Sequence, residues 1–208
     1  MKVRTHYNII NLSFGPMQNN SLQGKMYQRL YCIGAVLPDL SIMQFYHRHY
    51  YKTWKNYIYA KIIKLKKKSE LNAHDMLTLG EIVHYLSDFS CSVHKNAGIG
   101  NSKEHIIYER KLNKLLLSKK SRFKGKCIEK YNSMPFHMDV SHVNADDLIN
   151  LIEDIHANYE NKEENMETDV ITAMIFAKII GNNMAANKLY KPVVVKKPTE
   201  SIPLGNLA

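Results

Sequence analysis

The sequence is poor in the residues that break or cross-link a chain. It has three cysteines, six prolines and nine glycines among 208 residues. The small, odd set of cysteines (Cys32, Cys91 and Cys127) excludes a scaffold built on disulfides. No apolar run approaches the roughly 18–20 residues of a membrane-spanning helix. With 45% apolar and 23% charged residues, the composition is that of a globular protein rather than a disordered or collagen-like chain.

A secretory leader is also missing from the start of the sequence. The segment MKVRTHYNIINLSF has basic residues, but it has neither the apolar core of a signal peptide nor a small-residue cleavage site. We therefore expect a cytoplasmic protein.

Acidic residues are scarce in the first third of the chain. Residues 1–68 contain 12 Lys and Arg but one acid, Asp39, for a net charge of +11. Residues 69–137 carry +4 and residues 138–208 carry −5, which gives the total of +10. A basic surface attracts phosphate-rich partners, so nucleic acid, a membrane surface and small phosphorylated molecules are all candidates. A charge that serves only solubility is the alternative.

Most of the chain has helical periodicity, and the alternation typical of strands is nearly absent. Helices are expected over residues 17–33, 50–68, about 72–90, 102–119, about 144–160 and 164–189. In residues 50–68, Trp54, Ile58, Ile62 and Leu65 fall on one helix face, and lysines fall on another. The aromatic and basic side chains of this 50–68 helix suit a headgroup interface or stacked bases, but we favour a core helix with a solvated lysine face.

The connections between these helices are short. Residues 34–41 are expected to form a turn, because Pro38 disfavours helical backbone at Leu37. Residues 95–102 and 134–144 are predicted loops, and residues 118–126 a basic connector. The sequence therefore predicts an all-α fold, a single-domain multi-helix bundle over residues 1–190, followed by a flexible tail over 191–208.

The ten histidines include two that are paired with carboxylates at helical spacing. His84 and Asp88 are four residues apart, as are His105 and Glu109, so each pair shares one helix face. His94 lies between the pairs. Imidazole and carboxylate are zinc ligands. One such pair is common on a solvated helix, but two pairs joined by a short loop indicate a metal site.

His74, His137, His142, His156 and the central cysteine are not part of this constellation. We expect His137 and His142 in loops, and His74 and His156 on helix surfaces. Cys91 lies close to the candidate site and is expected to be a buried thiol.

These motifs resemble those of the zinc-dependent phospholipase C family. HYLSDFSCSVH, which runs from His84 to His94, is similar to the central histidine–aspartate–histidine segment of the family, and HIIYE at 105–109 to its next element. THYNIIN around His6, PDL at 38–40 and HYY at 49–51 resemble the earlier ligand motifs of the family.

The resemblance implies a trinuclear zinc site between the helices, with two or three ions bound. Its implied ligands are Asp39, His49, His84 and Asp88 for one ion, His94, His105 and Glu109 for a second, and His6 and bridging Asp88 for a third. The family also uses its N-terminal amine on the third ion, and Met1 stands here in place of the family's tryptophan. Because the stretch between Asp39 and His49 is short, His47 is an alternative ligand.

The function that the resemblance implies is a zinc-dependent phosphodiesterase. It would hydrolyse a phospholipid headgroup or a related anionic or zwitterionic phosphodiester with a metal-activated water, and Asp39 would be both ligand and general base. Cys91 and Ser92 stand where the secreted enzymes usually have Gln-Pro, which leaves the substrate open. The alternatives are a nuclease or nucleotide phosphodiesterase, like the related fungal single-strand nucleases, and a non-catalytic metal-stabilised module that binds membrane or nucleic acid.

Overall fold

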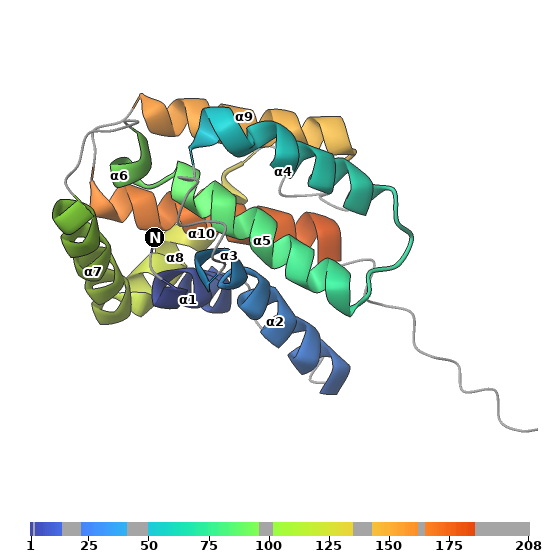
Figure 1. Cartoon of the computed structure of the whole chain (residues 1–208), viewed down its shortest axis with the longest axis horizontal. Helices are drawn as coiled ribbons and strands as arrows, with labels where there is room; N and C mark the ends of the chain where they lie inside the picture. The colour runs from blue at the N-terminus through green and yellow to red at the C-terminus, as the bar shows by residue number, and fades with distance from the viewer. Residues whose placement is uncertain are drawn as a thin grey trace, which may run out of the picture.

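The computed structural model describes residues 1, 3–13, 22–40, 50–95, 102–134, 143–161 and 165–185. Every regular element in these ranges is a helix, which confirms the all-α prediction. The helices are α1 (Val3–Ser13), α2 (Leu22–Gly34), α3 (Leu37–Leu40), α4 (Tyr51–Lys66), α5 (Ala73–Phe89), α6 (Ser92–Lys95), α7 (Ser102–Ser118), α8 (Lys120–Asn132), α9 (Ala145–Glu160) and α10 (Met166–Ala185) (Figure 1).

Helices α5 and α10 run through the centre of the molecule and pack on each other (Figure 1). On one side they are covered by α4 and α9, which lie side by side. On the other side lie α1, α2, α7 and α8, of which α2 packs along α5 while α1 and α8 pack on α10. The N-terminus lies near α1 and α7 (Figure 1), and its amine contacts residues of α5, α6 and α7.

Helix α5 begins at a well-defined cap. The Asn72 side chain accepts a hydrogen bond from the backbone N–H of Asp75 at 3.0 Å, and the Asp75 carboxylate accepts one from the N–H of Asn72 at 3.0 Å. This reciprocal pair satisfies two donors that a helix start otherwise leaves unpaired. Lys68 adds an ion pair to Asp75 at 2.6 Å. The cap fixes where α5 starts, and therefore where its later residues point.

Helices α2 and α5 approach each other closely at two glycines. A Cβ atom at Gly34 would overlap the backbone of Leu77, and one at Gly80 would overlap the backbone of Tyr31 and Ala35. Both positions therefore need glycine, because the two helix backbones approach too closely for a Cβ atom. This close contact holds the end of α2 against the middle of α5.

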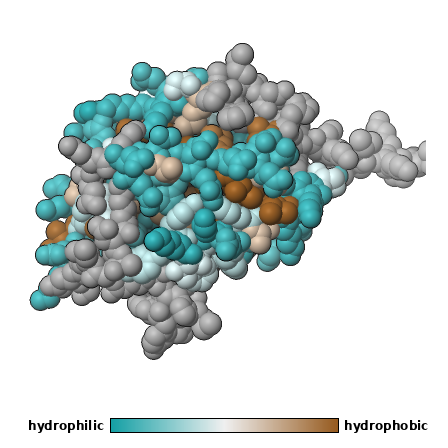
Figure 2. Space-filling view, turned by 90° about the horizontal axis from the view of Figure 1, so that it is seen from above, coloured by the Kyte–Doolittle hydropathy of each residue, from teal (hydrophilic) through white to brown (hydrophobic). Residues whose placement is uncertain are grey.

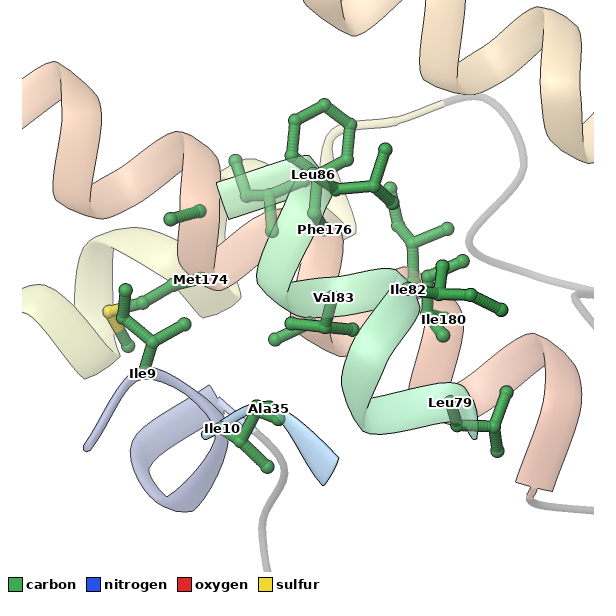
Figure 3. Packing of buried hydrophobic residues seen from close by; sticks show 14 of the residues in the cluster. Ile9, Ile10, Ala35, Leu79, Ile82, Val83, Leu86, Met174, Phe176 and Ile180 are labelled. Atoms are coloured by element: carbon green, nitrogen blue, oxygen red, sulfur yellow. The ribbon is translucent and has the colours of Figure 1, made fainter. Parts of the chain in front are cut away.

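The core surrounds α5 on three sides. Figure 3 shows Leu79, Ile82, Val83 and Leu86 of α5 together with Ile9 and Ile10 of α1, Ala35, and Met174, Phe176 and Ile180 of α10. Each of these side chains is at most 1% exposed. Helix α10 is buried around most of its circumference, which explains its nearly continuous apolar sequence.

Three sequence expectations about helices are wrong. Residues 3–13 form α1, although no helix was expected there. Residues 120–132 form α8 instead of a basic connector, because Phe123, Cys127 and Tyr131 recur every four residues and are buried. Pro38 lies inside the short helix α3 rather than in a turn, since a proline in a first turn has no N–H bond to lose.

The predicted face of α4 is confirmed. Ile58, Ile62 and Leu65 are buried, and Trp54 stacks on Tyr85 of α5 with ring centroids 4.9 Å apart. The interpretation of α4 as a core helix is therefore supported. His156 of α9 was expected on the surface, but it is 5% exposed. Its ring packs edge-on against that of Tyr51, with ring centroids 3.8 Å apart.

The surface over α4 and α9 is mostly hydrophilic, with a small hydrophobic patch (Figure 2). Within the described part of the chain, no helix is long and apolar enough to cross a bilayer. The predicted tail over 191–208 lies outside the described residues, so the domain boundary near residue 190 stays a prediction.

Candidate metal centre

The centre of the site is Asp88, a 1% exposed carboxylate near the end of α5. Its Oδ1 lies 3.3 Å from Nε2 of His6 and 3.7 Å from Nε2 of His94, and its Oδ2 lies 3.4 Å from Nε2 of His84. The helical spacing of His84 and Asp88 therefore produces the contact that the sequence predicts. Histidines from α1, α5 and α6 meet at one carboxylate.

An inner cluster lies on one side of Asp88 and consists of His6 (α1), Asp39 (α3) and His84 (α5). Asp39 places Oδ2 3.8 Å from His6 Nε2 and Oδ1 3.8 Å from His84 Nε2. The two imidazole rings lie 4.1 Å apart. One nitrogen or oxygen from each of the three residues lies within 4.8 Å of the others, which is close enough for a single ion to contact all three.

The orientation of His84 is set by α2. Its Nδ1 lies 3.0 Å from the carbonyl oxygen of Ala35. A carbonyl only accepts hydrogen bonds, so Nδ1 carries the proton and donates, and Nε2 keeps its lone pair toward Asp39 and Asp88. A histidine held by a backbone carbonyl in this way is typical of metal ligands.

An outer cluster lies on the other side of Asp88 and consists of His94 (α6), His105 and Glu109 (both α7). His105 Nε2 lies 2.9 Å from Glu109 Oε1, and the rings of His94 and His105 lie edge to face at 4.8 Å. Their ligand atoms again lie within 4.8 Å of one another. The i, i+4 spacing predicted the first contact, and α6 brings His94 to it.

Asp169 of α10 supports the outer cluster, and the sequence analysis missed it. This fully buried carboxylate accepts hydrogen bonds from Ser92 N at 2.9 Å, Ser92 Oγ at 2.9 Å, Tyr108 Oη at 2.6 Å and Tyr159 Oη at 2.8 Å. Ser92 is two residues before His94, and Tyr108 directly precedes Glu109. The only sequence signal for this role was an acid at the start of the apolar part of α10.

The amino group of Met1 lies between the two clusters. It donates to Asp88 Oδ1, and it lies 3.2 Å from both His94 Nε2 and Glu109 Oε1. Burial disfavours its charge, but Asp88 and Glu109 outweigh burial and raise the pKa of this amine to about 12. A positive charge is therefore favoured at this point.

The carboxylates and His94 are held in their ligating protonation states. Burial opposes ionisation of Asp88, yet the Met1 amine and the surrounding histidines hold its pKa well below the usual range. Burial likewise opposes ionisation of Glu109, but the His105 hydrogen bond and the Met1 amine lower its pKa to about 2. Burial lowers the pKa of His94 to about 3, so this imidazole is neutral at pH 7.

The donor set fits zinc. Both ring nitrogens of His6 are buried and have no hydrogen-bond partner among the described residues. Leaving a buried polar group without a partner is costly, so the Nε2 of His6 that faces Asp39 and Asp88 suits a cation ligand. Imidazole and carboxylate groups converging without thiolate are ligands that zinc accepts.

The structure therefore brings together seven of the eight predicted ligands: His6, Asp39, His84, Asp88, His94, His105 and Glu109. It groups His6 with Asp39 and His84 as well as with Asp88, the contact the resemblance implied. His49 and its alternative His47 lie outside the described residues, as do His137 and His142. Cys91 is fully buried and free, as expected, and burial raises its pKa.

Neither a curated protein nor a solved structure matches the chain. The family model for zinc dependent phospholipase C matches residues 5–166, which is well over half of the chain. The matched range contains both clusters and Asp88, while Asp169 lies just beyond it. The chain belongs to the zinc dependent phospholipase C family.

Proposed function

We propose that the chain is a zinc-dependent phosphodiesterase that hydrolyses a phospholipid headgroup or a related phosphodiester. The observation that carries the proposal is the pair of clusters on either side of one buried aspartate. Two ions bound to a common carboxylate suit phosphoester hydrolysis, in which attacking and leaving oxygens both need charge compensation. Family membership supports the same chemistry.

In this proposal His6, Asp39, His84 and Asp88 would hold an inner zinc ion, and His94, His105 and Glu109 would hold an outer one. Asp88 and the Met1 amine, once it has lost its proton, would contribute to a third. Bound zinc would supply activation of water and neutralisation of phosphate charge. The ligand assignment rests on the distances given above.

Asp39 is the candidate general base. Its side chain is 21% exposed, whereas those of His6 and His84 are at most 1% exposed. Solvent therefore reaches the inner cluster from the side of Asp39. A carboxylate that borders both the cluster and solvent can take a proton from an attacking water.

Asp88 has a different role in the proposal. It is 1% exposed and contacts three histidines, so it has no room to exchange protons with substrate. It provides a fixed negative charge between the two clusters. That charge would balance cations bound at either cluster.

Three measurements test the proposal. Zinc content and turnover of a soluble chromogenic phosphodiester are measured on the purified chain. Phosphatidylcholine is then compared with single-stranded DNA. We expect at least two zinc ions per chain, turnover, and release of phosphocholine in preference to nucleotide. Asp39→Asn should lower kcat about 100-fold or more, the usual effect of losing a general base.

The alternatives predict other outcomes. A folded chain with less than one zinc ion contradicts the metalloenzyme. Zinc without turnover of either substrate favours a binding module. Faster cleavage of single-stranded DNA favours the nuclease, which the basic residues 1–68 would suit.

A further inference from the structure

Helices α1, α2 and α3 expose large apolar side chains on one part of the surface. We call this part the α1–α3 face. It consists of Tyr7 (45% exposed), Met26 (47%), Ile33 (46%), Leu37 (46%) and Leu40 (63%). Single exposed apolar residues are ordinary, but a group of them on adjoining elements marks an interaction surface.

The exposed apolar residues of α2 form one stripe. At 100° per residue, Leu22, Met26 and Ile33 lie within about 40° of one another on the helix surface. Gly24 and Tyr31, which are buried, lie on the opposite side, and the backbone of Tyr31 adjoins Gly80 of α5. The stripe therefore points away from the protein, and α2 is apolar on both sides. Leu22 at the free end of the stripe is 86% exposed.

A hollow of about 530 Å³ joins this stripe to α1 and α3. Its apolar walls include Tyr7 of α1, Ile33 of α2, and Leu37 and Leu40 of α3. Tyr7 and Leu40 are the chain neighbours of His6 and Asp39 in the inner cluster. The α1–α3 face and the metal centre are thus carried by the same two helices, α1 and α3.

On α1 and α2 the charges beside the α1–α3 face are all positive, whereas α3 contributes Asp39 of the inner cluster. Arg4 lines the hollow, and Lys25 and Arg29 are exposed on α2 near the stripe. Neither α1 nor α2 contains an acidic residue. Two lysines elsewhere differ, because Lys61 of α4 pairs with Glu81 at 2.6 Å and Lys68, which follows α4, pairs with Asp75 at 2.6 Å.

We propose that the α1–α3 face docks onto the surface of an anionic phospholipid membrane. Exposed apolar side chains with cations at their edge are the composition by which a helix lies in a membrane interface. Arg4, Lys25 and Arg29 have no ion pair among the described residues, and their charges complement anionic headgroups. If the proposed function holds, docking brings the inner cluster to its substrate, which is then a lipid in a bilayer rather than a free phosphodiester.

Co-sedimentation of the zinc-loaded full chain with vesicles tests the docking. We expect binding to vesicles of phosphatidylcholine and phosphatidylserine, and weaker binding to phosphatidylcholine alone. Met26→Gln with Ile33→Gln should lower binding at least about tenfold, because both side chains lose their apolar contact. The matched control is Leu117→Gln with Ile128→Gln on α7 and α8. These residues are each 40% exposed, and binding should stay within about twofold.

A second pair of variants tests the charge. Lys25→Gln with Arg29→Gln should weaken binding to the anionic vesicles about tenfold or more. The difference in binding between the parent chain and this variant should shrink at high salt. Lys120→Gln with Lys124→Gln, which removes two exposed charges from α8, is the control. Equal losses from both pairs would overturn the proposal in favour of non-specific attraction by the net charge of the chain.

The remaining outcomes also decide the proposal. Absence of vesicle binding by the parent chain overturns it. The proposal is also overturned if light scattering shows a dimer that the α2 variants dissociate, because the face then binds a second copy of the chain. All variants should keep the parent circular dichroism spectrum and melting temperature, since the substituted side chains are exposed.

Turnover separates docking from the proposed function. If both hold, Met26→Gln with Ile33→Gln lowers hydrolysis of vesicle lipid but leaves turnover of a soluble chromogenic phosphodiester unchanged. If the parent chain hydrolyses neither substrate but still binds vesicles, the proposed function fails and the docking stands. A loss of soluble turnover equal to the loss on vesicles would mean that the substitution damages the metal centre, which contradicts a separate docking surface.

Discussion

The inner and outer clusters use the same ligand types but are positioned differently. The inner cluster comes from the middle of helices α1 and α5 and from α3, and the packing of α2 against α5 orients His84. The outer cluster comes from the short helix α6 and the first half of α7. Its histidines are more exposed, with His94 at 10% and His105 at 34%. Helix packing therefore builds one cluster, and a buried polar network around Asp169 builds the other.

Removing the residue that both clusters share should have the largest effect. Asp88→Ala takes away the carboxylate that contacts His6, His84 and His94, so we expect loss of zinc from both clusters. Turnover of a chromogenic phosphodiester should fall about 1,000-fold or more. The control is Glu81→Gln on the same helix, at a partly exposed side chain that contacts Lys61 and Tyr57 of α4. An Asp88→Ala protein that retains two ions would show that the clusters are independent.

Removing Asp169, which supports the outer cluster, should weaken metal binding there and leave the inner cluster intact. Asp169→Ala leaves the donors of Ser92, Tyr108 and Tyr159 without their common acceptor. We expect a loss of about 3 kcal/mol in the free energy of unfolding. Zinc affinity at the outer cluster should fall about 10- to 100-fold, while the inner ion is retained.

Denaturant unfolding and zinc titration measure these two effects of Asp169→Ala. Asp146→Ala, at an exposed acid in the first turn of α9, serves as the reference. Equal loss of both ions would mean that Asp169 supports the fold as a whole and not the outer cluster.

A substitution at the α2–α5 contact should affect the inner cluster instead. In Gly34→Ala the new methyl group meets the backbone of Leu77, so α2 must move away from α5. We expect a loss of about 1–3 kcal/mol in stability, because overpacking strains a tight contact. The carbonyl of Ala35 moves with it, which should weaken the inner zinc ion. Gly125→Ala, where a Cβ meets open space, should be neutral or slightly stabilising.

The smallest effect should come from the cap of α5 and should depend on pH. Burial opposes ionisation of Asp75, but the N–H of Asn72 and the ammonium of Lys68 lower its pKa below the usual value. A lowered pKa means that the ionised cap stabilises the fold above about pH 4 and that this contribution is lost as pH falls through the lowered pKa. Asp75→Asn should therefore cost about 1 kcal/mol at pH 7, and the cost should shrink toward pH 2. Urea unfolding at several pH values measures it, and a constant difference would argue against the ionised cap.

Local spacing made the contacts within each half of the site predictable. His84 and Asp88, and likewise His105 and Glu109, lie four residues apart on single helices, and both pairs are in contact. His6 and Asp39 could be joined to them only through the family resemblance. No pattern within residues 1–40 indicates which part of a later helix they will face, because tertiary packing decides it.

The features that were not predicted from the sequence have similar physical reasons. In α8 the lysines concealed the apolar repeat of Phe123, Cys127 and Tyr131, although the period was present in the sequence. His156 follows Leu148 and Ile152 at the same spacing, so its burial could also have been read from the pattern. Asp169 could not, because its four donors come from Ser92, Tyr108 and Tyr159, which lie on three separate helices.

The position of Asp88 between the clusters has a thermodynamic consequence. If both clusters bind zinc, the first ion withdraws electron density from a carboxylate that the second ion also needs, and the two like charges repel each other. Occupancy of one cluster then changes the affinity of the other, and the change is the same in both directions. Zinc titrations of this protein should not fit independent sites, and its melting temperature should rise in steps as metal is added.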